Sequence, residues 1–485
     1  MTIRTRFAPS PTGYLHIGGL RTALFSYLWA RKNKGSFILR IEDTDQKRYV
    51  KGAVDLLIKS LINVGLQPDE GLVAPGKERG KFGPYIQSQR LKIYQKSAQD
   101  LIHKGLAYYC FCSSQRLEKL KREQQDRQEM PHYDGRCRAL SETEIKKNLA
   151  QNRSAVIRFK IPPVEKIVVK DLLHGEITVS PRDLDDFILL KSDGYATYHL
   201  ANVVDDVGMK ISHVIRGEEW LPSLPKHILL YQAFGYKAPE FVHLPLLLNP
   251  DRSKLSKRQG DVSVEDFIGH GYLPSALINY VALLGWNPGT EREIFSLTEL
   301  SQEFSLKKLN KASAIFDVQK LNWFNAEYIR KIIKAGGKEY ADLAAYSVRF
   351  ITKMPERAKD LLRLFGSRLS RLNELDILSA WLWKLPKYDR KLLIFKKSTK
   401  DKTELGLKLA LDKLSSLDPK KWTQDNIFSA LENIVKENNL APGDVFWPVR
   451  LAISGQEKSP SPAEILEFLG AEESLARLQK ALSLL

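Results

Sequence analysis

A loop near the start of the chain has residue types that can bind an anion. Residues 9–19 read PSPTGYLHIGG, and Gly18 and Gly19 stand where apolar residues begin to recur at helical spacing. The N–H groups and the dipole at a helix N-terminus favour negatively charged ligands, and His16, two residues before Gly18, could donate to a phosphate. By itself, such a pattern is more often a tight turn with a satisfied histidine. The loop lacks both the Walker ending and the dinucleotide-binding glycine fingerprint.

A second loop, far along the chain, carries closely spaced cations. Residues 253–261 read SKLSKRQGD, so Lys254 and Lys257 lie three residues apart between serines and a glycine. Two flexible ammonium groups at this spacing can close onto a polyphosphate. Because a lone basic run is more often a solvated loop, this segment indicates phosphate binding only in combination with the first loop.

The elements that must position the first loop form a βαβ unit. Residues 3–8 and 36–41 read as strands, and between them Leu20, Leu24 and Leu28 recur at helical spacing. A strand, a glycine-rich loop, a helix and a second strand are the building block of a doubly wound, Rossmann-type α/β sheet.

The remainder of the chain changes in its charge and hydrophobic pattern along its length. A charged stretch at residues 116–129 lies between cysteines and is followed by short strand-like runs at 155–161, 167–169 and 176–179. We expect a separate α+β insertion there. Parallel-sheet character is predicted to resume at residues 187–190, 198–204 and 213–216. From about residue 265 onward the pattern is almost wholly helical.

Composition and charge exclude several classes of protein. With 485 residues we expect three to four domains, and 43% hydrophobic with 27% charged residues exclude wholesale disorder. Lysine and arginine exceed aspartate and glutamate by 75 to 57, a net charge of +18 that suits a nucleic-acid partner as well as a merely solvated basic surface. No apolar run approaches the roughly 18 residues of a membrane helix. No leader peptide is recognised and there are only three cysteines, so we expect a cytoplasmic protein without a membrane partner.

Together the two loops resemble the paired signatures of class I aminoacyl-tRNA synthetases. Six segments narrow the resemblance to the bacterial-type glutamyl-tRNA synthetases: RFAPSPTGYLHIGG, FILRIEDTD, GPYIQSQR, YHLANVVDD, VIRGEEW and KLSKRQGDVSV. Gly19 and Arg258 stand where many class I enzymes have other residues, as is common in the glutamyl branch. Ala196 stands where many members of this family have proline, and we expect this difference to alter only the local loop conformation.

The resemblance implies a fold and a reaction. The fold is an α/β Rossmann-type catalytic domain with an α+β insertion, followed by helical stem-contact and all-α anticodon-binding domains. The implied boundaries, in that order with the catalytic domain in two halves around its insertion, are residues 1–109, 110–190, 191–265, 266–325 and 326–485. The implied reaction attaches L-glutamate to tRNA(Glu) through a glutamyl-adenylate. It consumes ATP with Mg²⁺, releases pyrophosphate and AMP, and acylates the 2′-hydroxyl of the terminal adenosine.

The resemblance also implies site residues. The residues implied to bind glutamate are Arg6, Ala8, Ser10, Glu42, Tyr198, Asn202 and Arg216. Those implied to bind ATP are Thr12, His16, Gly18, Glu219, Trp220, Leu247, Lys254 and Lys257. His16, Lys254 and Lys257 are the implied catalytic residues. An arginine fork pairs well with a carboxylate and poorly with a neutral amide, which favours glutamate over glutamine at Arg6 and Arg216.

The three cysteines form a separate constellation. Some relatives of this family hold a structural zinc on a Cys-x-Cys pair and a distant Tyr-x-x-x-Cys, which implies Cys110, Cys112, Tyr133 and Cys137 as ligands here. Ala139 occupies the histidine position of the alternative Cys-x-His pattern. Three reduced cysteines that hold no metal fit the sequence equally.

Several alternatives share part of this pattern. A non-discriminating synthetase would also charge tRNA(Gln), and a non-catalytic tRNA-binding homologue would keep the fold without the reaction. A shortened paralogue that modifies a tRNA base lacks the C-terminal third, and glutaminyl synthetases end in β-barrels, whereas this C-terminus reads as helical. We expect a monomer.

Overall fold

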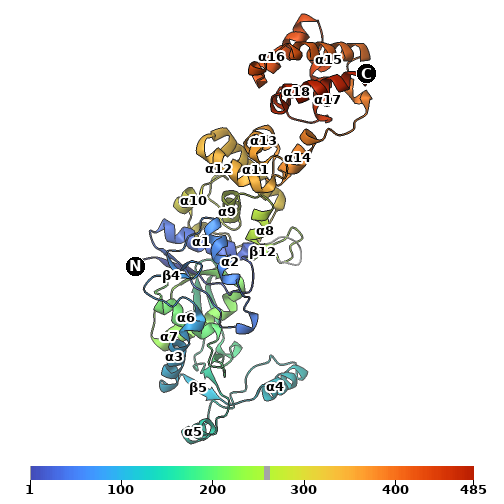
Figure 1. Cartoon of the computed structure of the whole chain (residues 1–485). Helices are drawn as coiled ribbons and strands as arrows, with labels where there is room; N and C mark the ends of the chain where they lie inside the picture. The colour runs from blue at the N-terminus through green and yellow to red at the C-terminus, as the bar shows by residue number, and fades with distance from the viewer. Residues whose placement is uncertain (1, 256–262) are drawn as a thin grey trace. The chain divides into compact units, whose positions relative to one another are not determined.

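The computed structural model of the protein describes residues 2–255 and 263–485, which form two compact units (Figure 1). The first unit runs up to Gly269 and resumes over Pro274–Leu321, and the second comprises His270–Leu273 and Asn322–Leu485. Lys257 and Arg258 lie outside the described residues. No helix within the described ranges is long and apolar enough to cross a membrane.

A six-stranded sheet forms the centre of the first unit. In spatial order its strands are β11 (Glu240–Leu244), β10 (His213–Gly217), β1 (Arg4–Phe7), β2 (Ser36–Leu39), β3 (Glu70–Ala74) and β4 (Lys77–Arg79). All neighbours are parallel except β3 and β4. The chain therefore places β2 on one side of β1 and β10 on the other, and ligands of doubly wound sheets bind at such a change of direction, beyond the carboxyl ends of the strands.

Helices cover both faces of this sheet. The helix α1 (Ile17–Lys32) packs on one face, where the ring of Tyr27 contacts that of Phe37 with centroids 5.6 Å apart. Side chains of a strand alternate between faces, so Ile38 belongs to the other face. There it shares a buried core with residues of α3 (Leu91–His103), α6 (Tyr198–Gly208) and α7 (Leu224–Phe234).

The segment between the two halves of the sheet contains smaller β structures and two helices. Three strands pair antiparallel in the order β5 (Ala107–Cys110), β6 (Val156–Phe159) and β9 (Ile188–Leu190). A hairpin is formed by β7 (Ile167–Asp171) and β8 (Gly175–Val179). The charged stretch between the cysteines forms α4 (Ser114–Asp126), and α5 (Glu142–Ala150) follows it. Outside this segment, the helix α2 (Ala53–Asn63) connects β2 to β3 of the parallel sheet.

Two of the predicted parallel strands are wrong. Residues 198–204 begin helix α6 instead, because Leu200, Val203 and Val207 recur at helical spacing and pack toward the core, which outweighs the strand preference of two adjacent valines. The run at 187–190 does form a strand, β9, but in the antiparallel sheet. The predicted strands at the start of the chain are confirmed as β1 and β2.

Past the sheet, the chain is mainly helical, as predicted. Within the first unit lie α8 (Val264–Gly269), α9 (Pro274–Leu283) and α10 (Leu297–Glu303), and a two-residue pairing joins β12 (Leu247–Leu248) to β13 (Ala314–Ile315). The helix α11 (Val318–Ala335) leads into the second unit. The other helices of that unit are α12 (Gly337–Ser347), α13 (Ala358–Phe365), α14 (Glu374–Trp383), α15 (Lys400–Ser415), α16 (Gln424–Glu437), α17 (Pro442–Ser454) and α18 (Pro462–Leu482). The last four pack against one another.

Candidate active site

A cavity of about 670 Å³ opens at the carboxyl ends of β1, β2 and β10. The predicted site residues that line it are Arg6, Ala8, Ser10, Thr12, His16, Gly18, Glu42, Tyr198, Asn202, Arg216, Glu219 and Trp220. Leu247 is buried in β12 and Lys254 is exposed beside it, and neither belongs to the described lining. Lys257, the remaining predicted residue, falls in the part of the chain that is not described.

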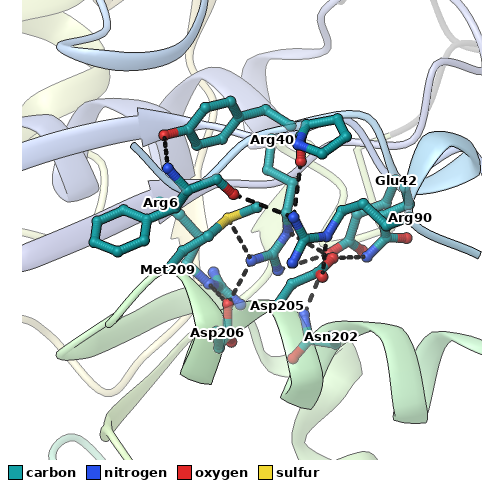
Figure 2. Close-up of polar contacts among 12 residues, drawn as sticks. Arg6, Arg40, Glu42, Arg90, Asn202, Asp205, Asp206 and Met209 are labelled. Atoms are coloured by element: carbon teal, nitrogen blue, oxygen red, sulfur yellow. Dashed lines mark hydrogen bonds and ion pairs between the residues drawn. The ribbon is translucent and has the colours of Figure 1, made fainter. Parts of the chain in front are cut away.

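One wall of the cavity rests on a buried ionic network that joins the sheet to α6 (Figure 2). Asp206 Oδ1 accepts from Arg6 Nε at 3.2 Å and from Arg40 Nη1 at 2.7 Å. Arg40 also donates through Nη2 to Glu42 Oε1 at 2.9 Å, and Asn202 Nδ2 donates to the same oxygen at 3.2 Å. The predicted ligands Arg6, Glu42 and Asn202 are therefore held in place from behind by Arg40 and Asp206.

Further charges complete this network. Asp205 accepts from Arg90 Nε at 2.7 Å, and Tyr94 Oη donates to the same carboxylate at 2.8 Å. Asn202, Asp205 and Asp206 share one face of α6 because they are spaced three and four residues apart. Three arginines, at positions 6, 40 and 90, thus face three carboxylates, at positions 42, 205 and 206, and all six side chains are buried. Equal numbers of opposite charges allow them to leave water together.

The network shifts the pKa values of its carboxyl groups in opposite directions. Burial raises the pKa of Glu42 above its usual value, although Arg40 and Arg6 oppose the shift. Burial acts in the same sense on Asp206, but there Arg6 and Arg40 prevail and lower its pKa. Glu42 uses Oε1 for both of its hydrogen bonds among the described residues. Its Oε2 is therefore available to a cationic group in the cavity.

Arg216, on the opposite side of β1, is a buried cation surrounded by neutral partners. It donates from Nη1 to Tyr198 Oη at 2.8 Å and from Nη2 to the Trp220 carbonyl at 3.4 Å. Among residues 2–255 and 263–485 no carboxylate forms an ion pair with it, although it is only 5% exposed. Buried charges in folded proteins are normally paired. An unpaired guanidinium that lines a cavity indicates an anionic ligand.

Tyr198 adds a neutral donor beside this arginine. Its ring lies against Trp220 with centroids 4.2 Å apart, and burial raises its pKa to about 12. The phenol therefore keeps its proton at neutral pH. Because its oxygen accepts from Arg216, that proton can be donated to the same anion that the arginine binds.

The glycine-rich loop forms the N-terminus of α1, as predicted. His16 is the N-cap, and its Nδ1 accepts from the Gly18 N–H at 2.9 Å. A neutral imidazole that accepts through Nδ1 carries its proton on Nε2. The Gly18 N–H is therefore used within the loop in this structure.

The two ends of the basic loop are both fixed in the first unit. Before the loop, the Leu255 N–H donates to the Leu247 carbonyl at 3.0 Å. After it, the Val264 N–H donates to the Leu15 carbonyl at 3.0 Å, and Ser263 pairs with His16. The chain thus returns from the basic loop directly onto the first signature loop.

The four predicted metal ligands lie together in the inserted segment. The sulfur atoms of Cys110, Cys112 and Cys137 are all within 4.8 Å of one another. Tyr133 Oη lies 3.3 Å from the Cys110 sulfur and 3.6 Å from that of Cys112. His132, the neighbour of Tyr133 in the sequence, instead places its Nδ1 3.0 Å from the Met130 carbonyl. Three thiols and a phenol, all buried except the half-buried Cys112, suit a tetrahedral metal ion.

Several residues that form the buried ionic network behind the cavity were not predicted from the sequence. Arg40, Asp205 and Asp206 lie inside the quoted segments, but nothing in a single sequence shows that Arg40 pairs with Asp206 across 166 residues. A signal was present at Arg40, which is a charged residue between Leu39 and Ile41 in a strand-like apolar run. A charge in such a run is normally paired in the folded protein.

Comparisons with known proteins agree with this geometry. Residues 2–323 match the catalytic domain of class I tRNA synthetases (E and Q), and residues 301–482 match an anticodon-binding domain. The fold and the site thus define a class I aminoacyl-tRNA synthetase. A glutamate–tRNA ligase of Clostridium novyi is 46% identical over 98% of this chain and 97% of its own length. One of Clostridium botulinum is 45% identical over 100% and 99%.

Solved structures give the same result. A glutamate–tRNA ligase of Elizabethkingia meningosepticum, in complex with its amino acid, superposes with a TM-score of 0.88 at 37% identity and covers 100% of this chain and 99% of its own. The glutamate–tRNA synthetase of Elizabethkingia anophelis gives a TM-score of 0.87 at 36% identity and covers 100% of both chains. The chain belongs to the glutamate–tRNA ligase family.

Proposed function

We propose that this protein attaches L-glutamate to tRNA(Glu) in two steps at the cavity described above. In the first, a carboxylate oxygen of glutamate attacks the α-phosphorus of ATP and pyrophosphate leaves. In the second, the 2′-hydroxyl of the terminal tRNA adenosine attacks the acyl carbon and AMP leaves. The observation that carries the proposal is Arg216, a buried guanidinium in the cavity wall without an acidic partner among the described residues.

The cavity offers complementary groups to each end of glutamate. Arg216 and Tyr198 would bind the side-chain carboxylate, and Glu42, fixed by Arg40 and Asn202, would accept from the α-ammonium group. Arg6, Ala8 and Ser10 would complete the contacts. Glutamine would leave the Arg216 charge buried without a counter-charge. We expect this to cost about 2–5 kcal/mol, which gives roughly 30-fold or stronger discrimination.

ATP, with Mg²⁺ as part of the substrate, would lie on the other side of the glutamate site. Thr12, His16 and Gly18 would contact it from the α1 loop, with Glu219, Trp220 and Leu247 opposite. Lys254 and Lys257 would close over the triphosphate. Catalysis then consists of holding the two reactants in line and neutralising the charge that develops on the phosphate oxygens.

The anticodon-binding match over residues 301–482 supports tRNA as the macromolecular substrate, and a net charge of +18 suits a polyanion. We propose a cytoplasmic monomer with the domain boundaries given by the sequence. Its insertion would bind the acceptor end of the tRNA. A second candidate, a non-discriminating enzyme, differs only in also charging tRNA(Gln).

The test is attachment of labelled glutamate to separate tRNA(Glu) and tRNA(Gln) transcripts at physiological salt. We expect charging of the first transcript alone. Charging of both would establish the non-discriminating enzyme, and charging of neither, with tRNA binding intact, would overturn the proposal in favour of a binding protein.

We further propose that Cys110, Cys112, Cys137 and Tyr133 hold a structural Zn²⁺. The ion would tie β5 to the segment after α4 and would take no part in the reaction. The test is metal analysis of the freshly purified protein beside a Cys112→Ser variant. We expect one zinc per wild-type chain and loss of it in the variant. Metal-free wild-type protein with full charging activity would refute the proposal.

A further inference from the structure

The Arg216 guanidinium is held from behind by a histidine that no step of the proposed reaction uses. Arg216 and His243 are direct partners in the register of β10 and β11. Arg216 Nε donates to His243 Nε2 at 2.9 Å, and the His243 side chain is fully buried. This bond uses the N–H nearest the stem of the arginine, so the Nη1 and Nη2 end faces the cavity.

The histidine is in turn held by a buried carboxylate. His243 Nδ1 and its backbone N–H lie 2.7 and 3.0 Å from Asp171 Oδ2. Asp171 Oδ1 accepts from the N–H groups of Leu173 and His174 at 2.9 Å each. His174 Nε2 lies 3.0 Å from the His243 carbonyl, which also fixes the turn of the β7–β8 hairpin on β11.

The direction of these bonds determines the state of the imidazole. Arginine can only donate, so His243 Nε2 must accept and must carry no proton. The single proton of the ring is then on Nδ1, where it is donated to Asp171. Burial lowers the pKa of His243, although the bond to Asp171 opposes that shift. Arg216 therefore donates to a neutral acceptor, and the imidazole ring of His243 separates it from the negative charge of Asp171.

A second histidine beside Arg216 is also neutral. His227 Nδ1 lies 3.4 Å from Arg216 Nη1, and burial, with Arg216 itself, lowers the pKa of His227 well below its usual value. A carboxylate at either histidine position would orient the guanidinium equally well. Such a carboxylate would also neutralise the positive charge of Arg216, which is the charge that favours the carboxylate of glutamate over the amide of glutamine.

We propose that His243, oriented by Asp171, is a positioning and specificity-determining residue that fixes the Arg216 guanidinium while leaving its positive charge to the side-chain carboxylate of glutamate. The inference rests on the proposed function, because it requires that Arg216 bind that carboxylate.

Three changes at this position separate orientation from charge. His243→Gln keeps a neutral acceptor near the place of Nε2, and His243→Leu removes the acceptor. The double change His243→Glu with Asp171→Asn keeps the net charge of the site but brings the negative charge into contact with Arg216. The exposed His103→Leu is the matched control for the loss of an imidazole.

The measurements are kcat and KM for glutamate in tRNA charging, the ratio of glutamate to glutamine activation, tRNA affinity and the melting temperature. We expect His243→Leu to raise the glutamate KM by about 10-fold or more with kcat changed less. We expect His243→Gln to restore most of that loss and to keep the glutamate preference. In the double variant the preference should fall by about 10-fold relative to His243→Gln, with tRNA affinity unchanged throughout.

The possible results distinguish a failure of the proposed function from a failure of the inference about His243. If wild-type protein charges glutamate and Arg216→Ala raises the glutamate KM by roughly 30-fold or more, the proposed function stands. In that case a KM for His243→Leu within about 2-fold of wild type, a His243→Gln variant as impaired as His243→Leu, or an unchanged preference in the double variant would overturn the inference. If His243→Leu does not fold, His243→Gln and the double variant, which both keep a polar side chain, still decide it. Failure of wild-type protein to charge glutamate would overturn the proposed function itself.

Discussion

Replacing Arg40 with methionine should destabilise the first unit far more than the loss of one surface cation would. Arg40 is fully buried and donates to both Asp206 and Glu42. Arg40→Met keeps most of the volume but leaves two arginines facing three carboxylates. Breaking a buried ionic group by removing one partner costs about 3–5 kcal/mol. We expect a loss of that size in unfolding free energy at pH 8.

The loss should shrink as the pH falls. Arg40 is the strongest of the charges that oppose the raised pKa of Glu42, so its removal raises that pKa further. A carboxyl group whose pKa is raised by folding destabilises the native state when ionised and ceases to do so once both states are protonated. The destabilisation is therefore complete above the folded pKa of Glu42 and is relieved as the pH is lowered through it.

Amide hydrogen exchange of peptides from β1, β2 and α6, measured at pH 8 and pH 5.5, reports the opening free energy of the sheet itself. The control is Arg122→Met, which removes an exposed ion pair with Glu118 on α4 and should cost less than about 0.5 kcal/mol. A loss below about 1 kcal/mol for Arg40→Met, or an equal loss at both pH values, would refute this reasoning.

Three further predictions concern Arg216, Gly18 and the buried histidines near Arg216. Arg216→Ala should raise the glutamate KM by roughly 30-fold or more while tRNA affinity stays near wild type; an equal loss of tRNA affinity would make Arg216 an RNA contact. Gly18→Ala places a methyl group 3.3 Å from the His16 ring, and it should raise the KM for ATP several-fold with an unchanged KM for glutamate; equal effects on both would contradict a role in ATP binding. Burial and neighbouring cations lower the pKa of His199 to about 4, and His227 is lowered well below its usual value. Both bind a proton only on unfolding, so stability is full above about pH 6.5 and falls toward pH 4 by up to about 1.4 kcal/mol per pH unit for each histidine. His199→Gln should flatten this slope in urea unfolding, and an unchanged slope would exclude it as the titrating group.

Local pattern was enough to predict the start of the sheet and the position of the α1 loop. Both depend on interactions between residues close in sequence, namely strand alternation, glycine at the helix start and apolar spacing. The quoted segments also supplied twelve residues that line one cavity. This agreement came from resemblance to a family rather than from spacing, because neither signature loop is specific by itself.

The groups behind the cavity wall could not be predicted in the same way. Asp206 stabilises Arg6 across 200 residues, and Asp171 orients His243 across 72. Such pairs exist only once the sheet has formed. The helix at residues 198–204 was missed for a related reason, since its polar face, which carries Asp205 and Asp206, is buried against arginines. Without those partners the segment does not read as an amphipathic helix with a solvated side.

The balanced network also constrains the order in which the chain can fold. Arg6, Arg40, Glu42 and Arg90, all from the first ninety residues, together carry two excess positive charges, and the two that match them, on Asp205 and Asp206, are made more than a hundred residues later. A nascent chain that has emerged only as far as the inserted segment would have to bury these cations without counter-ions. We therefore expect a ribosome-bound chain arrested before residue 205 to remain protease-sensitive around β1 and β2. Release of a few more residues, to include both aspartates, should confer protection.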